Sequence, residues 1–558
     1  MITYRLALAS IIFCFIYTIV THIHDYHLMI SKKLKTNYVP LMQTYMMDHT
    51  NYSKFKQSYN ETSLNMIEEP GYCIESDTLK LLHPDILLQD KYILRELDKG
   101  NLQREIIKSR MFDSIQNIQP LQKPTTKFQH KIPPQLSYFY TYKPRLQDNY
   151  HLGQGLGCMF QKLNHIPGLY TLTSKNSLIY NYAKYIYDMK KRNASSQCIG
   201  NASYVPDTLR LNVKSECQSF FKYLNKLQDE YQQKTRVYNG PDYLLKTDEH
   251  RGEGIRLLFQ KQIENITEVY QNGELCGNVS EKIVAQKYIN QPFLYKGHKI
   301  EFRMYIYLAS SKPLQLYMYK RALIKRCANE YNPLSESIPA HICNTAITEK
   351  SHKNQSNGAE NQEEDEEMFI DWNLEGIEEL LKEQGRIPKN QNWLQEYLYP
   401  RIYVKIIHTI RSGQYAFYQD SRFCEFLAID FLLDNDLDIW LLEINYNPQI
   451  LSVTPDRIKR NYKMIEDTME IAFAYLKSKY KRIKKFLEEE LMNYQYTGIR
   501  IRQVDFRNQF GKQFNQLLDD TQIDQEFSLS KDNLYSHIID ESKQGSEKYF
   551  NLIDPECI

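Results

Sequence analysis

Two apolar runs late in the chain, FLAIDFLLD and IWLLEIN, flank an Asn-Asp turn within residues 423–452. This pattern predicts a hairpin of two buried β-strands. Each run holds one carboxylate, Asp430 or Glu443, and Asn445 shares the strand face of Glu443 because side chains alternate along a strand. Pairing the strands would gather two carboxylates and an amide oxygen, a donor set that suits Mg²⁺. An ordinary hairpin with one charge on each strand is the alternative.

Residues 241–258 predict a strand that ends at Lys246, a polar loop containing Gly252 and Gly254, and a second strand. Two glycines allow backbone N–H groups to approach phosphate oxygens closely. The loop matches neither a P-loop nor a Rossmann turn, so a plain hairpin turn remains the alternative to a nucleotide-binding loop.

Residues 282–309 predict a buried strand, a linker through Tyr288, and a second strand on which Glu301 and Arg303 lie on one face. Alternating charge within an apolar strand indicates a polar cleft, with an edge strand as the alternative. Residues 314–326 continue the sheet with a further apolar pattern.

Helical patterns occupy the rest of the chain. One helix is expected to begin near Lys175, two more cover 372–385 and 397–417, and a long one covers 457–494. The last carries the basic cluster KSKYKRIKK, which would attract an acidic partner, although exposed lysines on a helix are common. The amphipathic stretch 86–112 predicts two further helices, and the last sixty residues are polar and predict no element.

Composition limits the function classes. The net charge of +2 over 558 residues gives no general attraction to nucleic acid, so no nucleic-acid partner is expected. Ten cysteines without a CxxC pair predict neither a zinc site nor a disulfide framework.

The apolar stretch 6–20 has the length of a signal peptide or a short membrane anchor. No clear cleavage site follows, so an uncleaved anchor that ties the chain to a membrane is favoured over a cleaved signal or a buried helix. Three lysines after the stretch, against Arg5 before it, favour a cytosolic catalytic part. Sequons such as those at Asn193 and Asn201 are consistent with the lumenal side instead, although an Asn-rich chain contains several sequons by chance, so both sides stay open.

We therefore expect four parts: a hydrophobic segment over residues 1–30, a polar extension over 31–150, a core over 151–478, and a basic helix with a polar tail over 479–558. The acidic run 351–367 within the core is expected to be a disordered insertion.

From about residue 155 to 476 the chain resembles the tubulin tyrosine ligase-like family of ATP-grasp amino-acid ligases. The resemblance rests on six motifs in the family's order: NHIPG with TSKNSL, PDYLLKTDEHRGEGI, QKYINQPFLYKGHKIEFR, YMYKRALIKR, HICN, and FLAIDFLLDNDLDIWLLEINYNP. It implies an α/β (α+β) ATP-grasp fold with nucleotide between two lobes of mixed sheet, extended by an N-terminal hydrophobic helix and further helices. It also implies a ligase that activates a carboxylate of tubulin as an acyl phosphate and joins an amino acid, expected to be glutamate, to it.

The resemblance assigns roles to individual positions, with ATP and Mg²⁺ as cofactors. The ATP-binding residues would be Lys175, Lys246, Arg251, Gly252, Gly254, Gln286, Lys287, Tyr288, Ile289, Lys299, Glu301 and Asn344. Within this set, the run from Gln286 to Ile289 would line the adenine. The Mg²⁺ ligands would be Asp430, Glu443 and Asn445, and the catalytic residues Arg303, Lys325 and Glu443.

Several positions depart from the family pattern. Glu301 stands where the family has Asp, Lys325 where it has Arg, and Glu349 where it has a basic residue. Replacing Arg by Lys exchanges a bidentate fork for a point charge. The sequence thus supports ATP binding more strongly than glutamate as the added amino acid. Two alternatives stay open: a catalytically weakened member that binds nucleotide or microtubules, and a lumenal ligase acting on a protein other than tubulin.

Overall fold

The computed structural model describes the residues that form the body of the chain and two isolated short strands. These residues are 162–247, 254–270, 273–277, 283–343, 374–446, 448, 450, 455–495, 516–517 and 521–542, with 94–96 and 138–140. The chain divides into two compact units, Met1–Glu69 and Pro70–Ile558, and all described residues belong to the second. The apolar stretch 6–20 and the acidic run 351–367 lie outside the described residues.

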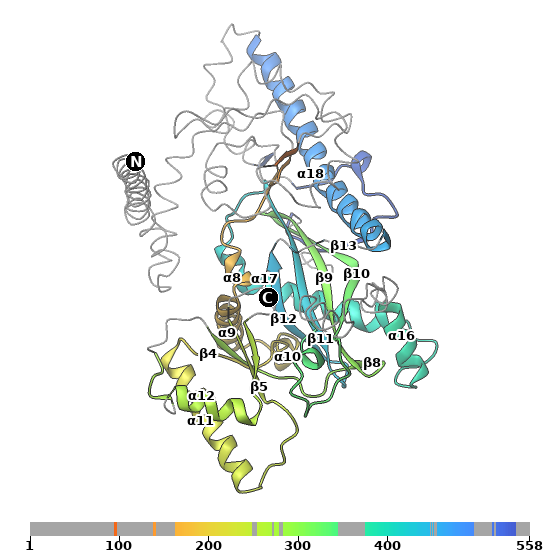
Figure 1. Cartoon of the computed structure of the whole chain (residues 1–558). Coiled ribbons are helices and arrows are strands. Elements are labelled where there is room, and N and C mark those ends of the chain that lie inside the picture. The colour runs from red at the N-terminus through yellow and green to blue at the C-terminus, as the bar shows by residue number, and fades with distance from the viewer. Residues whose placement is uncertain are drawn as a thin grey trace, which may run out of the picture. The chain divides into compact units, whose positions relative to one another are not determined.

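A nine-stranded sheet forms the larger layer (Figure 1). Its strand order is β1 (Leu94–Glu96), β2 (Tyr138–Tyr140), β3 (Lys162–Asn164), β11 (Phe423–Leu433), β9 (His298–Ser311), β10 (Leu314–Arg326) and β13 (Tyr535–Asp540). Two further strands pair at its side, β12 (Ile439–Tyr446) with β11 and β8 (Leu294–Tyr295) with β9. The first four strands run parallel and the other pairings are antiparallel.

A smaller, wholly antiparallel sheet has four strands in the order β4 (Thr208–Arg210), β7 (Val284–Lys287), β5 (Tyr243–Lys246) and β6 (Ile255–Leu257). Leu245 and Ala285 on one of its faces share a core with helix α11 (Lys214–Gln232) and helix α12 (Gln260–Val269). With two sheets and their covering helices, the described part of the chain is a mixed α/β fold, as expected.

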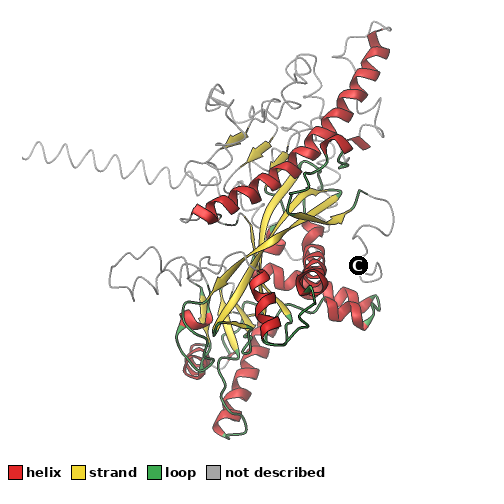
Figure 2. Ribbon diagram, turned by 90° about the vertical axis from the view of Figure 1, so that its right-hand side faces the viewer, coloured by secondary structure: helices red, strands yellow, loops and turns green. Residues whose placement is uncertain are grey.

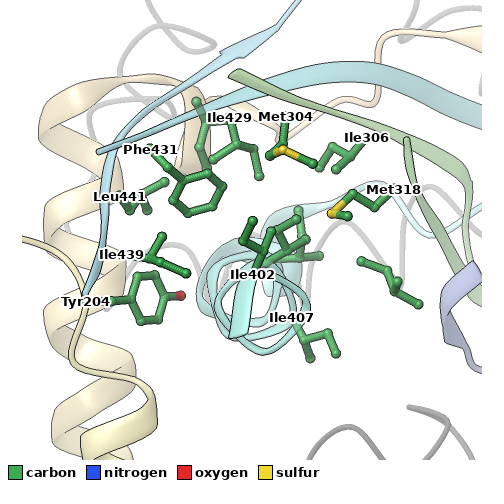
Figure 3. Packing of buried hydrophobic residues seen from close by; sticks show 14 of the residues in the cluster. Tyr204, Met304, Ile306, Met318, Ile402, Ile407, Ile429, Phe431, Ile439 and Leu441 are labelled. Atoms are coloured by element: carbon green, nitrogen blue, oxygen red, sulfur yellow. The ribbon is translucent and has the colours of Figure 1, made fainter. Parts of the chain in front are cut away.

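Strand β9 shows why the larger sheet is covered on both faces. Its even-numbered residues from Ile300 to Leu308 lie in one core with helix α17 (Tyr399–Gly413). Isoleucines at 402, 406 and 410 recur every four residues along α17, so they form one apolar stripe that faces the sheet. In Figure 3, Ile402 of this helix points toward Met304 of β9 and Phe431 of β11.

The remaining helices pack around these layers. On the face of α17 lie α8 (Tyr170–Thr173), α9 (Lys175–Lys191), α10 (Ser196–Asn201), α16 (Leu374–Glu383) and the π-helical turn η5 (Leu394–Leu398). The opposite face carries the long helix α18 (Pro455–Gln495), which packs on Tyr305 and Tyr307 of β9 (Figure 2). The short elements are α13 (Ile338–His341), η6 (Gln414–Ala416) and η8 (Gln525–Phe527). No helix within the described ranges is both long and apolar enough to cross a membrane.

Two expectations about local structure are wrong. Part of the stretch 86–112 expected to be helical forms the strand β1, which pairs in parallel with β2. Pairing with a distant strand overrides the local amphipathic pattern here. The polar tail also contains an element that was not expected, since β13 extends the sheet beside β10.

The chain's own C-terminal segment engages basic residues of α18. Lys481 lies 2.5 Å from Glu526, and Arg482 pairs with Asp524. A third basic residue, the buried Lys479, donates instead to the Ser421 hydroxyl, just before β11. Cations that already have carboxylate partners attract an acidic tail more weakly. Docking of an acidic partner on this helix stays a prediction and has to compete with these internal ion pairs.

The prediction that the chain has no disulfide framework is wrong. Cys217 is joined to Cys276 and Cys327 to Cys343, and Cys198 is disulfide-bonded as well. The partners lie 59 and 16 residues apart in sequence, so no short spacing signals them. Only the fold brings their Cα atoms to 5.7 and 4.0 Å.

We expect Cys343→Ser to lower the free energy of unfolding by about 2–4 kcal/mol, because opening a loop of this length restores conformational entropy to the unfolded chain. Urea unfolding of the full chain measures the loss. The double variant Cys327→Ser/Cys343→Ser should cost little more than the single one, since both break the same bond. An unchanged midpoint in both variants would contradict a stabilising role for this disulfide.

Candidate active site

A pocket lies between the two sheets and the start of α9. It is lined by Leu172, Thr173, Lys175, Leu178, Ile179, Lys246, Val284, Gln286, Leu442, Glu443, Ile444 and Asn445. Its polar side chains come from three directions: Lys175 from the first turn of α9, Lys246 and Gln286 from the smaller sheet, and Glu443 and Asn445 from β12. The helix and the two sheets thus bring two cations and one carboxylate together beside an apolar wall.

The register of the smaller sheet explains the pocket's lower side. Lys246 pairs with Val284 across β5 and β7, and Leu244 pairs with Gln286. Residues two apart on a strand share a face, so Lys246 and Gln286 leave the sheet on the pocket side. Leu245 and Ala285 between them enter the core beneath α11.

A β-bulge shapes the opposite side of the pocket. Asp430 pairs with Glu443, and the next residue of β11, Phe431, pairs with Leu441, so Leu442 is the extra residue. The bulge lets Leu441 and Ile444 both enter the core, although they are an odd number of positions apart. It also leaves the Leu442 carbonyl oxygen 3.5 Å from Lys246 Nζ.

Asp430 is the centre of a buried ion cluster beside the pocket. Its carboxylate accepts two hydrogen bonds from Arg303, from Nε at 2.7 Å and Nη2 at 2.8 Å, and one from Lys325 Nζ at 2.7 Å. Asn445 Nδ2 lies 3.3 Å from Asp430 Oδ2 and 3.1 Å from Glu443 Oε1. Burial alone would raise the pKa of Asp430, but Arg303 and Lys325 outweigh it and hold the pKa well below its usual range.

Lys246, in the pocket wall, and Lys299 are both buried, and nearby carboxylates offset the cost of burying their charges only in part. Burial lowers the pKa of Lys299 to about 8, an effect that Glu301 opposes and Lys246 strengthens. Burial also lowers the pKa of Lys246, against the carboxylates of Glu443, Glu301 and Asp430. Both ammonium groups therefore lie where an added negative charge would be stabilising.

The structure brings together most of the residues singled out from the sequence. The cationic members of this group are Lys175, Lys246, Lys299, Arg303 and Lys325, and the anionic members are Glu301, Asp430 and Glu443. Gln286 and Asn445 add amide groups in the pocket wall. Cations outnumber carboxylates in this group, so it favours an anionic ligand.

Other predicted positions lie elsewhere. Lys287 is exposed at the end of β7, with its backbone N–H donated to the Asp207 carbonyl at 2.7 Å. Ile289 is half-buried in the following linker, and Gly254 is the residue just before β6. Arg251, Gly252 and Asn344 lie outside the described residues.

The donor set fits a divalent cation bound together with phosphate. Glu443 is 30% exposed, and its Oε2 atom lies 4.0 Å from Lys175 Nζ. Mg²⁺ in proteins commonly takes one or two carboxylates and completes its shell with phosphate oxygens and water. Within the described ranges no group of three or more His, Cys, Asp or Glu side chains is placed to hold a metal. A metal here would therefore rely on Glu443, Asn445 and oxygens of the ligand, with Asp430 already bound by two cations.

His341 joins the site without having been assigned a role from the sequence. It lies at the end of α13, fully buried, and its carbonyl oxygen accepts a hydrogen bond from Lys299 Nζ at 2.8 Å. The HICN motif contains both His341 and Asn344, so a signal existed, but only Asn344 was assigned a role from it.

The fold and the pocket define a mixed α/β protein that presents a cation-rich site to an anionic ligand between two sheets. The pattern of the Tubulin-tyrosine ligase family matches residues 155–481, more than half of the chain. The chain belongs to this family.

Several curated relatives are similar over the same region. The probable beta-tubulin polyglutamylase of Tetrahymena thermophila is 28% identical over 351 residues, which are 60% of this chain and 26% of the relative. Tubulin polyglutamylase TTLL7 of Mus musculus is 26% identical, over 52% of this chain and 29% of its own length. The probable tubulin polyglutamylase ttll-9 of Caenorhabditis elegans is 23% identical, over 64% of this chain and 79% of the relative. The chain thus spans under a third of the first two relatives.

One solved structure, the C-terminal domain of K. lactis Pby1, described as an ATP-grasp enzyme, aligns with 69% of this chain and 93% of its own. The identity is 16% and the TM-score 0.41, which is too low to define the fold.

We expect Asp430→Asn to lower the free energy of unfolding by about 3 kcal/mol or more, because it leaves Arg303 and Lys325 buried beside a neutral group. Asp430 is 2% exposed. Glu443→Gln is the matched control: its side chain opens to the pocket, and a loss below about 1 kcal/mol is expected. Equal losses in urea unfolding would contradict the distinct roles of these two carboxylates.

Proposed function

We propose that this chain is an ATP- and Mg²⁺-dependent ligase that adds an amino acid, glutamate in the first instance, to tubulin. The observation that carries the proposal is the pocket in which Lys175 and Lys246 face Glu443 and Asn445. Membership of the family and the names of the relatives support the substrate class. We further propose that the two sheets are the two halves of an ATP-grasp fold, with the nucleotide in the pocket between them.

The proposed reaction has two steps. An acceptor carboxylate oxygen attacks the γ-phosphorus of ATP, the bond to the bridging oxygen breaks, and ADP leaves. The amino group of the incoming amino acid then attacks the acyl carbon, loses a proton and expels inorganic phosphate. Bound Mg²⁺ would neutralise phosphate charge during the transfer. Glu443 and Asn445 would hold that ion, and Lys175, Lys246 and Lys299 would bind the phosphates.

The substitution at Lys325 does not by itself favour a weakened enzyme. Its ammonium lies 2.7 Å from Asp430 Oδ2, so a cation still meets this carboxylate. The amino-acid donor then needs other contacts for its carboxylates, or Lys325 has to share its charge with the donor. The proposal that glutamate is the donor is therefore separate from the proposal that the chain is a ligase.

The disulfides favour a second candidate function. Disulfides persist mainly in oxidising compartments, and at least two join distant parts of this chain. A lumenal ligase that modifies a protein of the secretory pathway would fit this chemistry, with the same ATP site. A protease-protection assay on fractionated cells distinguishes the two sides of the membrane.

The direct test is to incubate the purified full chain with ATP, Mg²⁺, tubulin and each labelled amino acid in turn. Mass spectrometry of the tubulin tails identifies the added residue. Transfer of glutamate supports the proposal as stated. Transfer of another amino acid would retain the ligase and overturn the donor, and no transfer to tubulin would overturn the acceptor.

Glu443→Gln should reduce ligation by about 10²-fold or more, because it removes a charge that holds the cation against the phosphates. The rate of labelled amino-acid transfer measures the loss. Circular dichroism should show an intact fold, since this carboxylate is partly exposed. Transfer at the wild-type rate would remove Glu443 from the catalytic site.

The affinity for ATP should fall as the pH rises above about 8, because the Lys299 ammonium, with its pKa near 8, loses its proton there. Below that pH the group is charged and affinity is full; above it, each pH unit costs up to about tenfold. Titration calorimetry between pH 7 and 9.5 measures the change. Lys299→Arg stays charged and should make the fall shallower, with Lys246 accounting for the remainder. A flat wild-type profile would exclude Lys299 from phosphate binding.

A further inference from the structure

Three buried side chains from three separate elements meet at Lys299, whose ammonium interacts with the charge of the pocket residue Lys246. Tyr288 follows β7, Lys299 lies on β9 and His341 ends α13. The Tyr288 hydroxyl lies 2.8 Å from His341 Nδ1 and 3.4 Å from Lys299 Nζ. His341 also contacts Lys299 directly, through its carbonyl oxygen at 2.8 Å.

The proton positions in this group follow from the chemistry of the partners. His341 Nε2 lies 2.7 Å from the Ser335 carbonyl oxygen, which can only accept, so Nε2 carries the proton. In the neutral imidazole Nδ1 is then an acceptor, and Tyr288 donates its hydroxyl proton to it. Burial lowers the pKa of His341, and Lys299 strengthens this against the Ser335 hydrogen bond, so the ring stays neutral near pH 7.

Tyr331 also lies beside Tyr288, but its own hydroxyl donates to the Asn290 carbonyl at 2.8 Å. The Tyr288 proton therefore has two candidate acceptors, and imidazole nitrogen is more basic than a phenol oxygen. Once Tyr288 donates to His341, its oxygen lone pairs are available to the Lys299 ammonium. The direction of hydrogen bonding is then Lys299 to Tyr288, Tyr288 to His341, and His341 to Ser335.

These hydrogen bonds fix the orientation of the Lys299 ammonium. Two of its three N–H groups meet the His341 carbonyl and the Tyr288 oxygen, and its ammonium lies 4.7 Å from the centre of the Tyr288 ring. The backbone is held as well, since Cys327 N–H donates to the Lys299 carbonyl and Cys327 is joined to Cys343. The other charged groups acting on the ammonium are Glu301 and Lys246.

We propose that His341 is a positioning residue for nucleotide binding: through Tyr288 and its own carbonyl it orients the Lys299 ammonium so that one N–H remains for a phosphate oxygen. This inference rests on the proposed function, because it takes ATP as the ligand. It adds a residue from α13 to the site and makes the segment after β7 part of the phosphate-binding machinery. His341 itself does not touch the ligand.

The test uses the full chain and titration calorimetry with ATP and Mg²⁺ from pH 7 to 9.5. Tyr288→Phe keeps the ring and deletes one oxygen, and His341→Leu deletes the acceptor for that hydroxyl. Each variant should weaken ATP binding about tenfold, the range for a hydrogen bond to a charged group. Each should also lower the pH at which affinity begins to fall. Tyr288→Phe removes an acceptor that stabilises the charged form of Lys299, and His341→Leu removes the partner that holds the Tyr288 hydroxyl with its lone pairs toward Lys299. The KM for the amino acid should stay unchanged.

The double variant and two controls separate positioning from simple folding effects. Tyr288→Phe/His341→Leu should lose about tenfold, not the hundredfold expected of independent sites. His341→Asn retains an acceptor near the Nδ1 position and should recover most of the affinity. His408→Leu removes a buried contact of the same kind, between the Tyr185 hydroxyl and His408 Nδ1 at 2.8 Å. This contact involves none of β7, β9 and α13, so the variant should leave the ATP profile unchanged.

The outcomes are distinct. Wild-type affinity and pH profile in Tyr288→Phe and His341→Leu would overturn the positioning role while ATP binding stands. Multiplicative losses in the double variant would overturn the coupling through Tyr288. A wild-type chain that binds no ATP would overturn the proposed function and this inference together. If His341→Leu does not fold, Tyr288→Phe alone decides, because it deletes a single atom.

Discussion

The burial of Asp430 is the constraint on which the site and the sheet both depend. A carboxylate that is 2% exposed is costly unless cations compensate it. Arg303 does so from β9, which pairs with β11, and Lys325 does so from β10, the next strand beyond β9. Those cations reach it only in one strand register, in which Arg303 pairs with Asp430 across β9 and β11. A slip of one residue would turn Ile429 and Phe431 out of the core and Asp430 into it. The hydrophobic core and the ion cluster therefore specify the same alignment.

The odd-numbered face of β9 explains why the site lies at one end of the sheet. Near its start this face carries Lys299, Glu301 and Arg303, and further along it carries Tyr305 and Tyr307. Helix α18 packs on the tyrosines, so this part of the face is dry and aromatic. The charged part lies toward the smaller sheet, where Lys246 acts on Lys299. The first part of β9 thus supplies charged residues of the site, and the later part supplies aromatic residues of the core under α18.

Local periodicity was enough to predict what depends on neighbouring residues. The hairpin of Asp430 and Glu443, the strand ending at Lys246 and the helix beginning at Lys175 are all confirmed. The bulge at Leu442 was not predicted. It is needed because Leu441 and Ile444 both enter the core, whereas regular alternation would place residues three positions apart on opposite faces. For the same reason the Lys325 contact with Asp430 could not be foreseen, since it depends on the pairing of β9, β10 and β11.

Contacts between distant segments account for the expectations that failed. The disulfides, the strand β1 and the ion pairs of α18 each join parts of the chain whose proximity no local pattern encodes. The assigned roles of the site residues stay predictions, although Lys175, Lys246, Gln286, Glu443 and Asn445 do line one pocket. Their position shows that these groups can act together.

The balance of charge indicates what kind of ligand the pocket can accept. Asp430 has its cations in the structure as it stands, whereas burial lowers the pKa of Lys246 and Lys299. The electrostatic cost in the site is therefore that of buried positive charge. A bound phosphate group would lower this cost and raise the pKa of both lysines toward that of exposed lysines. A divalent cation alone would add to that excess. The electrostatics thus favour a metal that arrives with phosphate oxygens over one that binds the protein first, since Glu443 and Asn445 then supply only part of its coordination shell.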